Sequence, residues 1–344
     1  MSLRRESGVC WCFAKGRLLV VATIALGGAL VAATDLSPVG AQRYVMGTMF
    51  EIIVYHPVRP AAERAVHDAM TEIVRLDQVM SHYKEDSDLS KLNRSTGRDF
   101  VVVDAALYDV VDRSLSFSRL SDGRFDVTVG PLVQLWKRAH GDGHRPSAEE
   151  IAAAKRCVGY RNIETGTPNR LRLRSDCVAI DLGGIGKGYA VERAIDILKA
   201  QGILDAMVNA GGSTIAVIGA PPGREGWPVR IGAPVRGSST LLLRDAAIST
   251  SQQSLATLPL ETEGFGEIVD PDRGVPIQDR ASVSVITANA TTSDALSTAL
   301  LLTPLREAPK LLEHFPDASA LWMSPGGTLQ AEYRASRLRP ADSR

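Results

Sequence analysis

The sequence predicts an α+β fold built as one compact domain. Strand-like segments come in runs with helical segments between the runs, whereas a βαβ protein would alternate single strands with helices. The 344 residues are 44% hydrophobic and 23% charged, which is typical of a globular protein with a full core. No proline- or glycine-rich linker divides residues 42–335, so we expect a single domain there.

Residues 1–41 have the pattern of an export signal. Basic residues precede an apolar run over 18–33, and the small residues Val39-Gly40-Ala41 follow it. The run is shorter than the roughly 20 residues that span a bilayer comfortably. We therefore expect cleavage after Ala41 or near Ala33 and a periplasmic protein. The alternative is an uncleaved segment that anchors the chain to the inner membrane. Residues 336–344 are predicted to be a flexible tail.

The charge balance and the cysteines restrict the class of protein. Lys plus Arg is 39 and Asp plus Glu is 39, so the chain has no excess of basic residues. A nucleic-acid partner is therefore not expected. Cys157 and Cys177 are the two cysteines outside the export signal. They could form a disulfide in an oxidising compartment or remain two buried thiols, and the sequence leaves both open.

The N-terminal half is expected to contain one strand and three helices. Alternating apolar residues predict the strand over 43–56. Asp104 is the predicted N-cap of the second helix, and Ser147 with Glu150 predicts a capping box for the third. The helices are predicted over 60–80, 105–120 and 148–158.

The C-terminal half reads as short strands and helices. The runs 170–174 and 177–182 are strand-like, and 318–333 is predicted to be a hairpin that turns at 325–327. Further strands are expected at 207–208, 214–218, 229–231, 241–243 and 281–288. Helices are expected at 186–201, closed by Gly202, and at 293–302 and 305–315.

Two glycine-containing segments are candidate ligand loops. The segment 123–132 (GRFDVTVGPL) reads as a rigid loop, with an ordinary tight turn as the alternative. The segment 179–190 (AIDLGGIGKGYA) reads as strand, glycine-rich turn and helix, so its free N–H groups and Lys187 favour a phosphate. A surface lysine in a plain turn is the alternative. The spacing is not G-x-G-x-x-G, which disfavours a nicotinamide dehydrogenase.

Asp294 and Thr298 form a candidate metal site. They lie four residues apart on a predicted helix, so their oxygens share one face. A carboxylate and a hydroxyl are hard ligands that suit Mg²⁺. The alternative is an aspartate near a helix start with an unrelated buried threonine.

Taken together and in this order, these segments resemble the ApbE family of FAD:protein FMN transferases. The two most specific family runs, G-x-[FM]-D-x-T-[VI]-G-P-L and D-L-G-G-[IV]-[AG]-K-G-Y-A, are matched at 123–132 and 181–190. Shorter blocks, beginning with the family's M-G-T, are matched at 46–48, 81–93, 211–212, 249–251, 267–271 and 294–298.

The resemblance implies a T-fold-related α+β domain with antiparallel sheets and packed helices. It also implies Mg²⁺-dependent transfer of FMN from FAD to a Thr or Ser hydroxyl, with release of AMP. The acceptor would be a membrane-associated flavoprotein of an electron-transfer system. The Mg²⁺ ligands would be the Asp294 carboxylate, the Thr298 hydroxyl and the Gly184 carbonyl. FAD contacts would come from Met46, Tyr83, Arg124, Phe125, Asp126, Asp181, Lys187 and Val269, with Tyr83 and Phe125 as stacking candidates.

Two positions depart from the family pattern. The family usually has a histidine, proposed as the base, where this chain has Glu267, so Glu267 and Asp270 are the catalytic candidates. The family's S-T-S-G reads Ser-Thr-Ser-Gln at 249–252. These departures leave two alternatives: a catalytically weak FAD-binding accessory protein, and a hydrolase that splits FAD into FMN and AMP. A solute-binding protein would explain export but not Asp294 and Thr298 beside the lysine loop.

Overall fold

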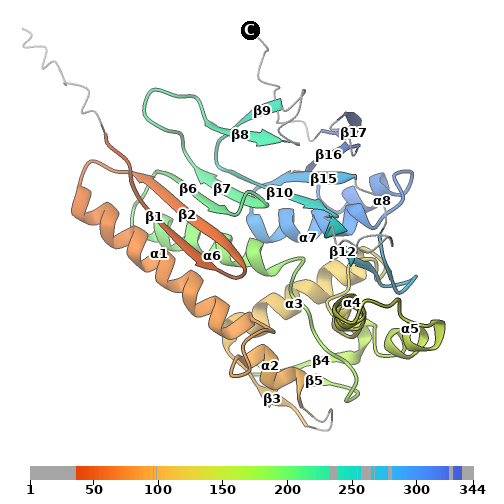
Figure 1. Ribbon diagram of the computed structural model, residues 1–344. Coiled ribbons are helices and arrows are strands. Elements are labelled where there is room, and N and C mark those ends of the chain that lie inside the picture. Colours follow the sequence, from red (N-terminus) through yellow and green to blue (C-terminus); the bar gives the residue numbers. More distant parts are fainter. Residues whose placement is uncertain are drawn as a thin grey trace, which may run out of the picture. The chain divides into compact units, whose positions relative to one another are not determined.

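The fold is seen in a computed structural model, which describes residues 36–95, 97, 99–231, 239–253, 255–256, 265–266, 268–277, 281–324 and 328–334. Residues 36–344 belong to one compact unit. The predicted α+β class is confirmed, because helices pack on sheets whose strands pair antiparallel (Figure 1). In the part of the chain so described, no helix is both long and apolar enough to cross a membrane.

The main element is an eight-stranded sheet in which every neighbouring pair is antiparallel. From one edge to the other, its strands are β1 (Val39–Val45), β2 (Thr48–Tyr55), β6 (Asp205–Ala210), β7 (Thr214–Ile218), β10 (Ala246–Gln252), β15 (Ser282–Thr287), β16 (Ser319–Met323) and β17 (Leu329–Tyr333). Strands far apart in sequence are therefore neighbours: β2 pairs with β6, and β7 pairs with β10.

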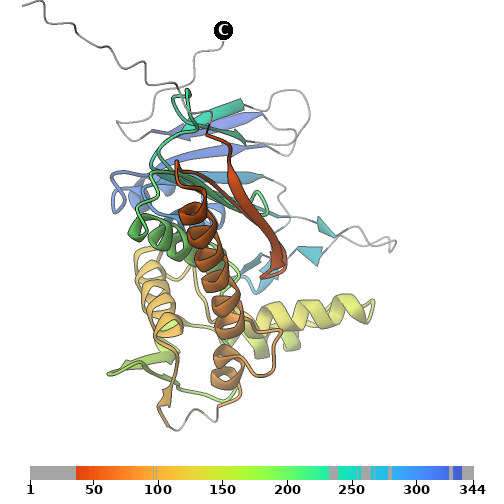
Figure 2. The same ribbon diagram turned by 90° about the vertical axis from the view of Figure 1, so that its left-hand side faces the viewer.

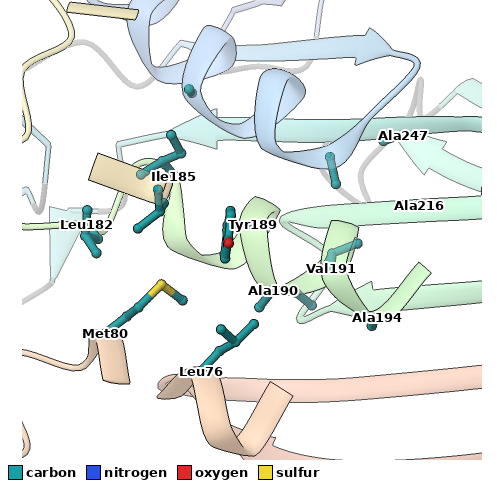
Figure 3. Close-up of a cluster of buried hydrophobic side chains, with 14 of the residues drawn as sticks. Leu76, Met80, Leu182, Ile185, Tyr189, Ala190, Val191, Ala194, Ala216 and Ala247 are labelled. Carbon is teal, nitrogen blue, oxygen red and sulfur yellow. The ribbon is translucent and has the colours of Figure 1, made fainter. Parts of the chain in front are cut away.

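Three helices cover one face of this sheet: α1 (Arg59–Met80), α6 (Gly186–Ala200) and α7 (Ala290–Leu301) (Figure 1). Figure 3 shows α6 between the other two, with Leu76 and Met80 of α1 on one side of Tyr189. Ala216 and Ala247 of the sheet belong to the same cluster. Alanines at the contacts let the helices approach the sheet closely.

The other elements surround this layer. A hairpin of β8 (Trp227–Ile231) and β9 (Ser239–Leu243) packs by its apolar side chains on strands of the sheet. In Figure 2 a group of helices extends away from the large sheet. The remaining helices are α2 (Asp88–Asn93), α3 (Ala105–Leu120), α4 (Gly130–Gly141), α5 (Ala148–Lys155) and α8 (Ala308–Leu312). The short strands are β3 (Val101–Val102), β4 (Ile163–Gly166), β5 (Arg170–Leu173), β11 (Leu255–Ala256), β12 (Phe265–Gly266), β13 (Val269–Asp270) and β14 (Val275–Pro276).

Most predicted elements are present with small shifts at their ends. The Asp104 carboxylate accepts from the Ala106 N–H at 2.8 Å, and Ser147 with Glu150 forms the predicted capping box. The predicted helix over 305–315 is shorter, because α8 ends at Leu312. The predicted turn at 325–327 lies outside the described residues, although its two strands pair.

The predicted single strand over 43–56 is wrong, because β1 and β2 form a hairpin there. Met46 and Gly47 make the turn with φ of 52° and 75°. Two positive φ values belong to a turn whose twist suits a hairpin, and a methionine there is unusual. The strand β1 begins at Val39, so the predicted domain boundary between 41 and 42 falls inside it.

The strand-like run 177–182 joins no sheet. It makes an isolated parallel bridge between Val129 and Ala179. The Asn93 side chain instead takes both backbone groups of Ile180, at 2.8 and 2.9 Å. A disulfide between Cys157 and Cys177, whose Cα atoms are 5.4 Å apart, fixes the start of this run near the end of α5. The two cysteines therefore pair, which the sequence left open.

Candidate functional site

A cleft of about 560 Å³ lies where the β1–β2 turn and the end of β10 meet α6 and α7. Every residue predicted to bind FAD or Mg²⁺ lines this cleft: Met46, Tyr83, Arg124, Phe125, Asp126, Asp181, Gly184, Lys187, Val269, Asp294 and Thr298. Of the two catalytic candidates, Glu267 lies outside the described residues, and Asp270 is not among the lining residues. The ordered motifs of the sequence thus converge on one place.

The glycine-rich turn leads directly into α6. The Asp181 carboxylate accepts from the Gly183 N–H at 2.7 Å and so fixes the start of the turn. Lys187 follows in the first turn of α6, with its ammonium 3.4 Å from the Gly183 carbonyl oxygen. A lysine beside a helix N-terminus gives this wall a positive potential, as a phosphate group requires.

Gly188 allows α6 and α7 to touch. A β-carbon at this position would lie 2.3 Å from the Ala290 carbonyl oxygen and 2.5 Å from Cβ of Asp294. Any side chain would push the two helices apart. The close approach also lets the Gly188 N–H donate to Asp294 Oδ2 at 2.7 Å.

Asp294 is buried in the wall of the cleft. Burial raises the pKa of its carboxyl, while the Lys187 ammonium and the Gly188 N–H act in the opposite direction. The charged form of a buried carboxylate is costly unless a cation or donor compensates it. This position therefore favours a cation close to the carboxylate.

The predicted metal ligands come together. A β-carbon on Gly184 would lie 3.3 Å from Thr298 Oγ1, so the Gly184 main chain lies beside that hydroxyl. Asp294 is one helical turn before Thr298. No group of three or more His, Cys, Asp or Glu side chains suited to a metal occurs among the described residues. A carboxylate, a hydroxyl and a carbonyl are nevertheless the hard oxygen donors that suit Mg²⁺.

A set of buried hydroxyls joins β10 to α7. The Ser251 Oγ lies 2.7 Å from Ser297 Oγ and 2.9 Å from Thr298 Oγ1. Further along, Ser249 Oγ lies 2.7 Å from Ser293 Oγ. These bonds orient the Thr298 hydroxyl from behind. Serines at alternate strand positions facing serines four apart on a helix are the sequence signal for this contact.

Tyr83 is the exposed aromatic side chain of the cleft, with 74% of its surface accessible. The Lys137 ammonium donates to its hydroxyl at 2.6 Å, and the His82 ring centroid is 3.9 Å from the Tyr83 ring centroid. Burial lowers the pKa of His82, although Asp181 lies 4.0 Å from its Nδ1. Neither His82 nor Lys137 was predicted from the sequence as a site residue. Both side chains contact the Tyr83 ring, which still remains largely exposed.

Phe125 and Asp126 have structural partners although they line the cleft. Phe125 is 3% exposed and packs edge-on against Phe117, so little of its ring is free for stacking. Both oxygens of Asp126 are occupied: Oδ1 accepts from the Thr128 N–H and hydroxyl, and Oδ2 accepts from the Tyr160 N–H at 2.7 Å. Burial raises the pKa of Asp126. FAD contacts by these two residues stay a prediction.

Arg124 also has a partner within the protein, since its guanidinium pairs with Glu307 at 2.7 Å. Asp270 stabilises a turn, because its Oδ1 accepts from the N–H groups of Asp272 and Arg273 at 2.9 and 3.0 Å. A catalytic role for Asp270 therefore has no support from its contacts. Val269 is buried beside Leu132.

The family model and the relatives found by comparison with known proteins indicate the same family. The sequence model of the ApbE family matches residues 46–322. The FAD:protein FMN transferase of Treponema pallidum is 30% identical over 323 residues, which cover 87% of this chain and 88% of the relative. The FAD:protein FMN transferase of Vibrio cholerae is 33% identical over 247 residues, which cover 67% of this chain and 72% of the relative.

Solved structures agree. The flavin transferase ApbE from Vibrio cholerae has a TM-score of 0.75 at 27% identity, with 88% of this chain and 98% of that chain covered. The ApbE protein from Thermotoga maritima has a TM-score of 0.74 at 30% identity, with coverage of 87% and 97%. The cleft, its ordered motifs and these likenesses lead to one conclusion: the chain belongs to the ApbE family.

Proposed function

We propose that this protein is a Mg²⁺-dependent FAD:protein FMN transferase. It transfers FMN from FAD to a Thr or Ser hydroxyl of a target flavoprotein and releases AMP. One observation carries the proposal: Asp294, Thr298 and Gly184 meet beside Lys187 in a single cleft. Relatives that carry the name FAD:protein FMN transferase align over most of the chain.

The chain's own residues bind and orient FAD. Lys187 and the N-terminus of α6 attract the pyrophosphate, while Tyr83 offers an exposed ring for stacking. Mg²⁺ held by Asp294, Thr298 and Gly184 would stabilise the negative charge that develops on the phosphates. Orienting the acceptor hydroxyl against the phosphorus supplies much of the remaining rate enhancement.

The transfer requires one base, because one proton leaves the acceptor hydroxyl. The acceptor oxygen bonds to the phosphorus on the FMN side, and the bond from that phosphorus to the bridging oxygen breaks. AMP leaves with the bridging oxygen, and the hydroxyl proton passes to the base. We assign the base to Glu267, at the position where the family usually has a histidine. Exchange of Glu267 for Gln should abolish transfer, and exchange for His should support it.

The direct test uses purified protein, FAD, Mg²⁺ and a flavoprotein domain of an electron-transfer system that carries the acceptor threonine. Mass spectrometry should show FMN on the acceptor, and chromatography should show one AMP for each FMN. Asp294→Ala should reduce transfer by at least about a hundredfold, since a metal contributes several kcal/mol to such a reaction. No flavin on the acceptor and no AMP would refute the proposal.

Two other outcomes of this test would identify other functions. FMN and AMP free in solution, with an unmodified acceptor, would identify a hydrolase. Bound FAD without any product would identify an accessory protein. The observation that favours the accessory function is Glu267, which stands where the family usually has a histidine.

We also propose that the protein is exported and that processing takes place near Ala33 rather than after Ala41. Val39, Gly40 and Ala41 pair with β2 in the register that holds β1 in the sheet, so removing them would shorten the edge strand. An uncleaved inner-membrane anchor is the alternative. Mass determination of the protein from the periplasmic and membrane fractions separates the two.

A further inference from the structure

Gln253 is a buried polar residue outside the family's motifs. It follows β10 directly and is 2% exposed. Its amide makes three hydrogen bonds to backbone groups: Oε1 accepts from the Ile268 N–H at 3.0 Å, and Nε2 donates to the carbonyl oxygens of Ile268 at 3.2 Å and Ile277 at 2.9 Å. An interior amide that uses its oxygen and its NH₂ group in this way holds its partners in one arrangement.

These three bonds close the open end of a small hairpin. Its strands, β13 and β14, are flanked by Ile268 and Ile277, and the Ile277 N–H donates to the Ile268 carbonyl at 3.1 Å. The turn at the other end is held separately, because the Trp136 Nε1–H donates to the Gly274 carbonyl at 2.9 Å. The hairpin is thus fixed at both ends, by Gln253 and by Trp136.

The hairpin is part of the cleft wall. Ile268, Val269 and Pro271 line the same cleft as the residues of α7 that we assign to the metal. Ile268 is also the residue after Glu267, the base of the proposed reaction. The N–H that Gln253 binds belongs to the peptide unit that joins these two residues.

The end of β10 connects this wall to the metal site. Ser251, two residues before Gln253, places its Oγ 2.9 Å from the Thr298 hydroxyl. The end of β10 and the residue that follows it therefore contact the proposed metal ligand Thr298 through Ser251 and the 268–277 hairpin through Gln253.

We propose that Gln253 is a positioning residue for flavin transfer, which fixes the 268–277 hairpin as part of the cleft wall. This inference rests on the proposed function. An amide is required because the partners include one N–H and two carbonyls, so the side chain must both accept and donate. A carboxylate of the same shape keeps the first bond and loses the other two.

The experiment compares Gln253→Glu and Gln253→Leu with the wild-type chain. Gln330→Glu is the matched control, because Gln330 is exposed on the edge strand β17 and the change in charge is the same. Hydrogen exchange of peptides covering 268–277 reports whether the three bonds of Gln253, here called the clamp, hold the hairpin. This measurement does not require activity. Steady-state transfer gives kcat and the KM for FAD, and a thermal shift gives the response to Mg²⁺.

Both Gln253 variants should exchange faster within 268–277 and lose ten- to a hundredfold in kcat, because small misplacements of reacting groups cost about that much. The KM for FAD and the Mg²⁺ response should stay within about twofold of wild type. Unchanged exchange, or faster exchange with unchanged kcat, overturns the inference. A fall in kcat that tracks faster exchange throughout the molecule also overturns it, since Gln253 would then be merely structural. A wild-type chain without transfer activity refutes the proposed function instead, and the exchange data still decide whether the clamp exists.

Discussion

At the scale of single residues, Asp294 meets two opposing demands if it is the metal ligand that we propose. Its burial favours the neutral acid, whereas a metal ligand must be ionised. Asp294→Asn keeps the shape and removes the charge. Without metal and at neutral pH, we expect the variant to unfold at a higher temperature than the metal-free wild type, because it buries no charge at this position. The same variant should gain no stability from Mg²⁺ and lose transfer by at least about a hundredfold. Scanning calorimetry with and without Mg²⁺ tests this.

Asp126→Asn is the matched control for that substitution, because Asp126 is also buried but both of its oxygens accept hydrogen bonds. An amide nitrogen there would face a donor, at a cost of about 1–3 kcal/mol. The control should therefore be less stable than wild type. Equal behaviour of the two variants would contradict the special position of Asp294.

His82 predicts a pH dependence of stability. Burial lowers its pKa in the folded protein, so the folded state binds the proton less readily than the unfolded state does. The contribution of neutral, buried His82 to the free energy of unfolding is therefore complete above the ordinary histidine pKa of about 6.5. It is lost as the pH falls from there through the lower pKa of the folded state. His82→Gln should lose less stability than wild type between about pH 7 and pH 5.

Denaturant titrations at several pH values test this, with His67→Gln at an exposed position of α1 as the control. The control profile should run parallel to that of wild type. Equal acid sensitivity of wild type and His82→Gln would show that His82 does not carry the effect.

The residues of the site were predictable to different degrees. The order of the motifs identified Asp181, Gly184, Lys187, Asp294 and Thr298, which line one cleft. Lys137 and Gln253 were not predicted, because their partners Tyr83 and Ile268 are distant in the chain or lie in another local motif. Only the folded chain brings such pairs together.

At the scale of elements, Gly188 controls the contact between α6 and α7. Gly188→Ala would place a β-carbon against backbone and Asp294 Cβ, neither of which can rotate away. We expect a loss of about 1–3 kcal/mol in the free energy of unfolding, as for overpacking elsewhere. The affinity for Mg²⁺ should fall as well, because Asp294 moves with α7. Denaturant unfolding and Mg²⁺ titration by calorimetry measure the two effects.

Gly141→Ala is the control, since Gly141 ends α4 and a β-carbon added there would meet no atom within 4 Å outside its own helix and chain neighbours. It should stay within about 1 kcal/mol of wild type, because alanine is the better helix former. If Gly188→Ala matched this control, the close contact of the helices would not matter for stability.

Local signals explain which elements were predictable. The capping box at Ser147 and the cap at Asp104 identified helix starts correctly. The strand β10 was missed because its two alanines have weak strand preference and it lacks an alternation of apolar and polar residues, and it becomes a central strand buried under α7. The helix α4 was missed because Gly130-Pro131 is typical of a loop, although proline is also favoured in the first turn of a helix.

At the scale of the whole molecule, the cleft joins segments from the entire domain. The β1–β2 turn, the end of β10, the start of α6 and the middle of α7 each supply part of its wall. The α+β class followed from the succession of patterns, but the strand order did not. Pairing of β2 with β6, and of β7 with β10, depends on contacts between distant segments that no local pattern encodes.

This arrangement predicts that ligands stabilise the whole domain together. A ligand that binds only the folded state at a hundred times its Kd adds about 2.7 kcal/mol. Because the proposed pyrophosphate and metal sites share the wall formed by Lys187 and Asp294, FAD with Mg²⁺ should raise the unfolding temperature by more than the sum of their separate shifts. In Asp294→Ala the excess should vanish while the shift with FAD alone remains. Strictly additive shifts in the wild-type protein would show that FAD and Mg²⁺ bind independently. The shared wall would then give no coupling free energy between the two ligands.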